Sequence, residues 1–189
     1  MVAAETSTSR GATLQPSALI LDSPWVVFKA SLLGRVVFVV AVAAAALAMG
    51  VMMGLFSGSR PENLGARDAR LALCKRTPNC VSSQADADKD TGHYIAPIRI
   101  QGSRRDAWAA LKSVLHSMPR VKIVADQDDY MYAESASRIM GFVDDVEFLL
   151  DEKAGVIHVR SASRLGSSDF GVNRDRIEMI RSRIAAAMK

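Results

Sequence analysis

Two clusters of polar residues in the second half of the chain contain side chains that can carry chemistry. The first is rich in arginine and serine, whose guanidinium and hydroxyl groups donate hydrogen bonds to phosphates and other anionic groups. A helix start expected beside them would add free backbone amides. The same residues can instead hold a loop to a sheet, and both interpretations stay open. The candidate ligand-binding residues are Arg160, Ser161, Ser163, Arg164, Ser167, Asp169, Asn173 and Arg176.

The second cluster is acidic and consists of Asp144, Asp145 and Glu147. Such carboxylates can hold a hard cation or act as a general acid and base. Strand alternation sends Asp144 to one face and the other two to the opposite face, so at most two converge. An exposed cross-strand pair of Glu147 with Arg160, worth about 0 to 1 kcal/mol, explains part of the cluster structurally. Asp144 is expected near Ser163 on the core-facing side, where a buried carboxylate needs hydrogen-bond donors.

Several classes of function are excluded by what the sequence lacks. It contains no G-x-S-x-G, H-E-x-x-H, Walker or G-x-G-x-x-G motif. His93, His116 and His158 show no metal-ligand spacing, so we expect no metal site and no cofactor. Beyond position 56 there are 21 Lys and Arg against 18 Asp and Glu, and aromatic residues make up only 6% of the chain. A nucleic-acid partner is therefore not expected, since it needs a concentrated basic stripe or stacking platforms.

The elements that position these residues follow a long apolar run. Residues 36–56 contain no charged side chain and would span roughly 30 Å as a helix, the thickness of a bilayer core. A buried soluble helix and a cleaved signal peptide are the alternatives, the latter because Ala46-Leu47-Ala48 resembles a cleavage site. The 35 residues ahead of the run favour an uncleaved anchor.

This run organises the rest of the chain. We expect a disordered tail at 1–24, an interfacial segment at 25–35, a transmembrane helix at 36–56, a linker at 57–90 and a soluble domain at 91–189. The lipid bilayer, contacted through residues 36–56, is the first expected partner.

The basic residues and the cysteines near the run give contradictory signals for the orientation of the anchor. Lys29 and Arg35 precede the run, whereas five basic residues follow it, which by the positive-inside rule leaves the soluble domain in the cytoplasm. Cys74 and Cys80, separated by five residues, can instead form a small disulfide loop in an oxidising compartment. Two free thiols or an incomplete metal site are the alternatives for this pair.

The soluble domain reads as strand, helix, four strands and helix. Ala96, Ile98 and Ile100 alternate as in an edge strand, and Ser103 is expected to cap the helix that follows. Two hairpins come next, with arms at 121–125 and 130–135 and then at 142–151 and 156–162. A last helix at 174–188 is expected to be capped by Asn173. This predicts an α+β fold with a mainly antiparallel sheet of about five strands, two packed helices and one N-terminal transmembrane helix.

The second hairpin has a register that accounts for both of its faces. Pairing Asp151 with Val156 sets Phe148 beside Val159 and Leu150 beside Ile157 on the core face. The same register sets Glu147 opposite Arg160 and Leu149 opposite His158 on the other face.

Three segments of the chain resemble a known family. FVDDVEF at 142–148, VRSASRLGSSDFGVNRDRI at 159–177 and TPNCVSS at 77–83 look like the domain-of-unknown-function 1499 family, and the resemblance covers about residues 73–187. It implies an exported or lumen-facing domain, often membrane-tethered, with paired cysteines near its start. Many members begin the motif with Cys-Pro, where this chain has Cys74-Lys75.

Together these features predict a membrane-tethered accessory or binding module of the bacterial envelope, anchored once in the inner membrane with its soluble domain in the periplasm. It would contact an anionic ligand or a membrane-protein partner. Two alternatives remain: an enzyme of unrecognised type acting on an envelope lipid or glycan, and a scaffold subunit of a membrane complex.

Overall fold

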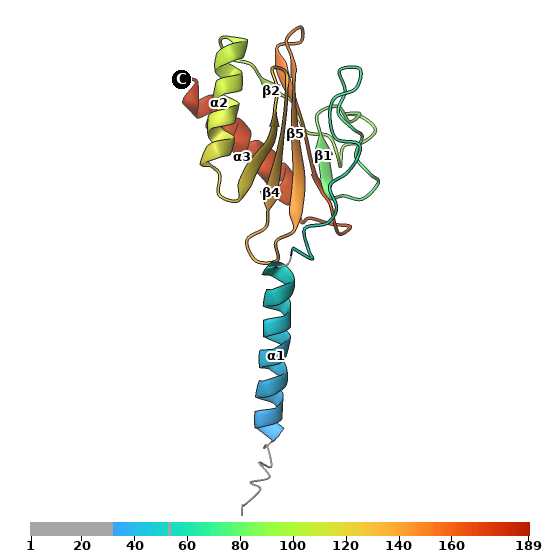
Figure 1. Cartoon of the computed structure of the whole chain (residues 1–189). Coiled ribbons are helices and arrows are strands. Elements are labelled where there is room, and N and C mark those ends of the chain that lie inside the picture. The colour runs from blue at the N-terminus through green and yellow to red at the C-terminus, as the bar shows by residue number, and fades with distance from the viewer. Residues whose placement is uncertain (1–31, 53) are drawn as a thin grey trace, which may run out of the picture. The chain divides into compact units, whose positions relative to one another are not determined.

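A computed structural model of the 189-residue chain describes residues 32–52 and 54–189 (Figure 1). The expected tail at 1–24 and most of the expected interfacial segment at 25–35 lie outside the described residues. The described helices are α1 (Leu32–Met52), α2 (Arg104–Ser117) and α3 (Val172–Ala187). The described strands are β1 (Cys80–Ser82), β2 (Ile98–Arg99), β3 (Val121–Asp126), β4 (Tyr130–Ala136), β5 (Val143–Asp151) and β6 (Val156–Ser163).

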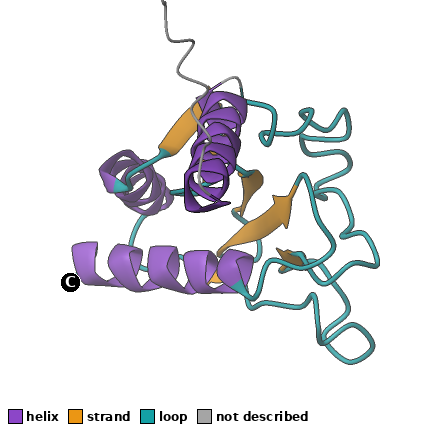
Figure 2. Cartoon of the chain, turned by 90° about the horizontal axis from the view of Figure 1, so that it is seen from below, coloured by secondary structure: helices purple, strands orange, loops and turns teal. Residues whose placement is uncertain are grey.

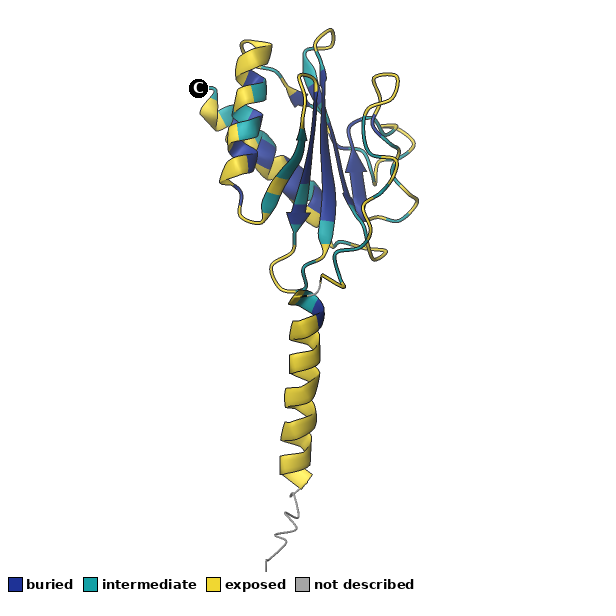
Figure 3. Cartoon of the chain, in the orientation of Figure 1, coloured by how far each residue is buried: buried dark blue, intermediate teal, exposed yellow. Residues whose placement is uncertain are grey.

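Helix α1 is the one described helix long and apolar enough to cross a membrane. It begins at Leu32, inside the expected interfacial segment, and ends at Met52, after which residues 54–56 form a turn. Nearly all of its described side chains are exposed, as a helix solvated by lipid would present them (Figure 3). By its contacts the chain divides into residues 1–40 and 41–189, and the second unit carries the sheet.

The fold is α+β, as expected, and its sheet is antiparallel throughout. The strand order is β1-β6-β5-β4-β3, with β2 pairing β6 beyond the end of β1. The predicted register of the second hairpin is confirmed, because Glu147 pairs with Arg160 and Phe148 with Val159. Helices α2 and α3 lie on one side of the sheet and the long loops on the other (Figure 2). We call these the inner and outer faces.

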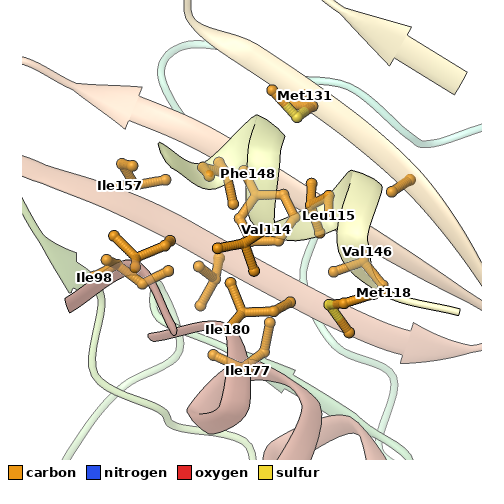
Figure 4. Packing of buried hydrophobic residues seen from close by; sticks show 14 of the residues in the cluster. Ile98, Val114, Leu115, Met118, Met131, Val146, Phe148, Ile157, Ile177 and Ile180 are labelled. Atoms are coloured by element: carbon orange, nitrogen blue, oxygen red, sulfur yellow. The ribbon is translucent and has the colours of Figure 1, made fainter. Parts of the chain in front are cut away.

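The inner face carries the main hydrophobic core. Phe148 of β5 has no exposed surface and packs in one cluster with Leu115 of α2 and with Ile177 and Ile180 of α3 (Figure 4). Burying each such side chain stabilises the fold by about 1.5 to 3 kcal/mol. The spacing of these residues on each helix is the one that the sequence pattern predicted, so the core fixes both helices on the sheet.

The expected linker at 57–90 is folded, which the sequence pattern did not predict. Residues Cys80–Ser82 form β1 along the edge of β6, and the chain ahead of them covers the outer face. Leu71 packs there in a second apolar cluster with Tyr130, Tyr132 and Leu149. Gly, Ser, Pro and Asn are frequent in this segment, and its contacts come from scattered side chains without periodicity.

The strand predicted around Ala96, Ile98 and Ile100 is shorter than expected. Only Ile98–Arg99 pairs as β2, and Ala96 is exposed while Ile95 is buried. Pro97 carries no backbone N–H and so cannot continue a ladder across this point.

Of the two predicted helix caps, one is confirmed and the other is wrong. Ser103 caps α2 as predicted, because its side chain accepts the N–H of Asp106 at 3.1 Å. Asn173 is not the cap of α3, which begins two residues earlier than expected, at Val172, after the left-handed Gly171. The side chain of Asn173 is fully buried and finds partners inside the protein.

Candidate functional site

The sheet separates the arginine and serine cluster into two groups on opposite faces. Ser161 and Ser163 point to the inner face, where Asn173 and Arg176 of α3 meet them. Arg160 and Arg164 project from the outer face. The residues expected to form one anion site therefore form two separate networks, because side chains of a strand alternate between faces.

The inner network connects α3 to the sheet through hydrogen bonds and an ion pair. Arg176 donates to Asp144 Oδ2 at 2.6 Å, to Asn173 Oδ1 at 2.6 Å and to Ser161 Oγ at 3.0 Å. Asn173 Nδ2 donates to Ser163 Oγ at 3.0 Å, and Asp144 pairs with Ser163 in the ladder as predicted. These buried groups satisfy one another, so this network holds the fold together and offers no free donor to a ligand.

The start of α3 does not offer its amides to an anion. Asp169 Oδ2 accepts the N–H of Asn173 at 2.8 Å, and Asp169 Oδ1 accepts that of Gly171 at 3.1 Å. The expected phosphate-type site at this helix start is therefore already filled by a carboxylate of the chain. Ser167 is exposed in the adjoining loop and joins neither network.

The outer network centres on Arg164, whose side chain is only 7% exposed. Its Nη2 donates to Glu134 Oε1 at 2.6 Å, to Asp145 Oδ1 at 2.7 Å and to the Tyr132 hydroxyl at 2.9 Å. Glu134 is also paired with Arg60 at 2.6 Å. Sequence reasoning missed Glu134, although its place opposite Asp145 in the ladder of β4 and β5 would have revealed it.

The ion pair of Glu147 and Arg160 is buried, which corrects the expectation of an exposed pair. Nη1 of Arg160 lies 2.8 Å from Glu147 Oε2, and the two side chains are 5% and 0% exposed. The other Glu147 oxygen accepts from the Tyr130 hydroxyl and from the amide of Gly65, each at 2.9 Å. The pair is buried because the folded segment ahead of β1 covers it.

Each carboxylate of the acidic cluster is engaged by a different arginine. Asp144 binds Arg176 on the inner face, and Asp145 and Glu147 bind Arg164 and Arg160 on the outer face. Within residues 32–52 and 54–189, no group of three His, Cys, Asp or Glu side chains could hold a metal ion. This arrangement favours the structural interpretation of the cluster over a cation site.

The titrating groups of the outer network are shifted away from neutrality. Burial would raise the pKa of Glu134, but hydrogen bonds from Arg60, Arg164 and Tyr132 lower it to about 2. Burial and the hydrogen bond to Asp145 raise the pKa of the Tyr132 hydroxyl. Burial raises that of Tyr130, with the charge of Glu147 adding to it. A general acid or base needs a pKa near the working pH, so these groups are suited to fixed charge and not to proton transfer.

A cavity of about 310 Å3 opens beside this network. Nε of Arg160 is the one buried side-chain nitrogen or oxygen without a hydrogen-bond partner among the described residues. Lys75 adds an exposed ammonium, and no ion pair involving it occurs in the described part of the chain. The polar lining includes Arg60, Lys75, Asn79, Asp145, Arg160 and Arg164.

The disulfide forms part of this site. Cys74 and Cys80 are joined, with their Cα atoms 5.7 Å apart, and Cys80 both begins β1 and lines the cavity. The loop that the disulfide closes carries Lys75 and Asn79. The bond therefore limits how far these two residues can move from Arg160.

A serine, a histidine and an aspartate also lie in line on the outer face. Ser83 Oγ is 3.1 Å from His158 Nδ1, and His158 Nε2 is 3.7 Å from Asp151 Oδ2. Ser83 is buried, however, and its hydroxyl already accepts the N–H of Val159 at 2.9 Å. The hydroxyl is thus held as a structural hydrogen-bonding group, without the exposure that a nucleophile needs.

Comparison with known proteins places the chain by family alone. No curated protein matches it. A family described as a protein of unknown function (DUF1499) matches residues 70–184, which is more than half of the 189 residues. The match includes the disulfide, the whole sheet and most of α3, close to the expected range of 73–187. This chain is a member of the DUF1499 family.

Proposed function

We propose that this protein is a membrane-anchored binding module of the bacterial envelope, and that it binds an anionic group in the cavity beside Arg160. The observation that carries this proposal is the buried Nε of Arg160 without a partner. A buried donor left unpaired costs about 1 to 3 kcal/mol. Arg160 lines this cavity, so a bound oxyanion that reached Nε would supply the missing acceptor. Lys75 would add a positive charge that has no ion pair within the described residues.

The anchoring half of the proposal is supported by α1 and by the disulfide. An apolar helix of 21 residues has the length that a bilayer requires. Disulfides persist in oxidising compartments, so the bond between Cys74 and Cys80 favours a soluble domain outside the cytoplasm. In a bacterium this corresponds to the periplasmic side of the inner membrane.

The cavity is better suited to binding than to catalysis. Its arginines are held by carboxylates. In the network that adjoins the cavity, whose Glu134, Tyr130 and Tyr132 do not line it, the shifted pKa values leave Glu134 charged and the tyrosine hydroxyls protonated at neutral pH. A fixed array of donors can recognise an anion without moving a proton. A binding module therefore fits this cavity better than an enzyme acting on a lipid or glycan.

The decisive variants must change the cavity without unfolding the network. Arg160→Ala with Arg164→Ala would leave Glu147 and Asp145 buried without their partners, so it cannot separate binding from folding. Lys75→Glu reverses an exposed charge on the cavity, and Arg160→Lys keeps the positive charge but removes Nε. Lys153→Glu is the matched control, because Lys153 is exposed in the turn between β5 and β6 and does not line the cavity.

The test is calorimetric titration of the full-length protein in mild detergent with inorganic phosphate, together with mass spectrometry of co-purified lipids and proteins. We expect anion binding in the wild type and in Lys153→Glu, and its loss in Lys75→Glu and Arg160→Lys. An anionic lipid that co-purifies with the wild type and Lys153→Glu, but not with the other two variants, would identify a lipid head group as the source of the anion. Binding that is absent from the wild type, or unchanged in Lys75→Glu, would refute the cavity as the site.

A further inference from the structure

Large apolar side chains are exposed at one end of the sheet. They come from the loop between β4 and β5 and from the region between β6 and the start of α3. Phe170 is 96% exposed and Ile139 is 78% exposed, which is unusual for apolar side chains of this size. The exposed set is Ile139, Phe142, Leu165, Phe170 and Val172. We call these five residues the apolar tips.

The sheet register brings the two loops together. Ala136 of β4 pairs with Val143 of β5, and Asp144 of β5 pairs with Ser163 of β6, so both loops leave the same end of adjacent strands. A cavity of about 290 Å3 is lined by residues of both loops, including Phe142 and Phe170. Four of the five apolar tips line this cavity, and Ile139 lies in the same loop as Phe142, so the tips gather at one end of the sheet.

Phe170 is held outward by a backbone conformation that costs energy. Its φ is +54°, in the left-handed region where a residue with a side chain loses about 1 to 2 kcal/mol relative to its usual conformations. Burial of the ring does not compensate for that cost, because the ring is almost fully exposed. Strain of this kind points toward a function for the exposed ring.

The chain that leaves α1 arrives at this same end of the sheet. Gly58 packs so closely on the β6 exit that a side-chain carbon there would lie 2.9 Å from Arg164 Cβ and 3.0 Å from Leu165 Cγ. The ring of Phe56 meets that of Phe142 with 5.9 Å between their centres. Six peptide units connect Met52, the last residue of α1, to Gly58, and they can reach about 20 Å at most. The tips are thus confined to the neighbourhood of the end of α1.

We infer that the apolar tips insert into the interface of the same bilayer that α1 spans, so that the domain is seated on the membrane surface. This inference rests on the proposed anchoring by α1. The lipid surface is the occupant that the tether selects, because the interfacial layer begins where a spanning helix ends. Phenylalanine and isoleucine side chains gain free energy by entering the acyl boundary from water.

The test places a photoreactive residue at the tip. Phe170 is replaced by p-benzoylphenylalanine in the full-length protein, which is reconstituted into lipid nanodiscs and irradiated. Lys153, in the turn at the opposite end of the β5–β6 hairpin, receives the same residue as the matched control. We expect lipid adducts at position 170 in several-fold excess over position 153, detected by mass spectrometry of the purified protein.

Two results separate this inference from the anchoring on which it depends. A protein that fails to enter nanodiscs refutes the anchor itself. A protein that enters them but yields no excess of lipid adducts at position 170, or crosslinks there to a second copy, refutes the seating of the tips alone. Phe170→Gly removes the exposed ring at a position whose positive φ glycine adopts without strain, so we expect the fold to be kept. It should therefore reduce lipid adducts from a benzoylphenylalanine placed at Ile139 while leaving nanodisc insertion intact.

Discussion

At the scale of single residues, the outer face of the sheet depends on charges that are removed from water. Glu147 is fully buried, and its two oxygens are shared among Arg160, Tyr130 and the amide of Gly65. A buried pair of this kind gains little over an apolar pair, yet losing one member is costly because the other charge stays behind. The network therefore specifies how the segment ahead of β1 lies on the sheet.

Glu147→Gln should lower the free energy of unfolding by about 3 to 5 kcal/mol, because it leaves the Arg160 guanidinium buried without a counter-charge. Glu152→Gln is the control, since the pair of Glu152 with Arg104 is exposed and worth about 0 to 1 kcal/mol. Urea unfolding of both full-length variants in detergent measures the difference. Equal losses in the two variants would contradict the burial described for Glu147.

His158 should make the domain less stable in mild acid. Burial lowers the pKa of His158 in the folded state, although the charge of Asp151 opposes this. The unfolded chain then binds a proton more readily, so this contribution to stability is present above about pH 6.5 and is lost as the pH falls below it. Thermal unfolding between pH 8 and pH 5 measures the loss, and His158→Gln should lose less over the same interval. An identical pH profile in the variant would exclude this histidine as the cause.

At the scale of elements, the sequence predicted what is periodic and missed what is not. The hairpin register and the division of Asp144 from Asp145 follow from the period of two along a strand, and both are present. The cap at Ser103 follows from a serine placed just ahead of a helical pattern, and it is present as well. The folding of residues 57–84 onto the outer face carries no such pattern. Only part of the candidate site could therefore be predicted from the sequence. Arg160 and Arg164 were identified, but the cavity that Lys75 and Asn79 line with them was not.

Gly58 should be the critical position of the entering segment. Gly58→Ala must accommodate a carbon 2.9 Å from Arg164 Cβ in addition to a positive φ of +66°. Gly155→Ala has nearly the same φ, +65°, with nothing within 4 Å, so it isolates the cost of the backbone conformation. We expect both variants to lose about 1 to 2 kcal/mol in urea unfolding, and Gly58→Ala to lose measurably more. If Gly155→Ala is the more damaged of the two, Gly58 does not pack as described.

At the scale of the whole molecule, the proposed anchor makes a prediction about the mature chain. If α1 stays in the membrane, the intact mass of the protein purified from membranes will include residues 36–56, and alkaline carbonate will not extract it. The physical reason is the burial of 21 largely apolar helical residues in lipid. A mature chain that starts shortly after Ala48 would instead identify a cleaved signal peptide.

The disulfide has a mechanical consequence for a tethered domain. Tension that enters from α1 would first meet the contact of Phe56 with Phe142 and the packing of Gly58 on the β6 exit. It would then meet the contacts of Arg60 with Glu134 and of Gly65 with Glu147, which also lie ahead of Cys74 in the chain. Once these yield, the covalent link from Cys74 to Cys80 passes the load directly to β1 and spares the five residues between. Beyond it, the short antiparallel pairing of β1 with β6 carries the force. The crosslink thus limits how far the stretched segment ahead of β1 can extend before the force acts on the sheet itself.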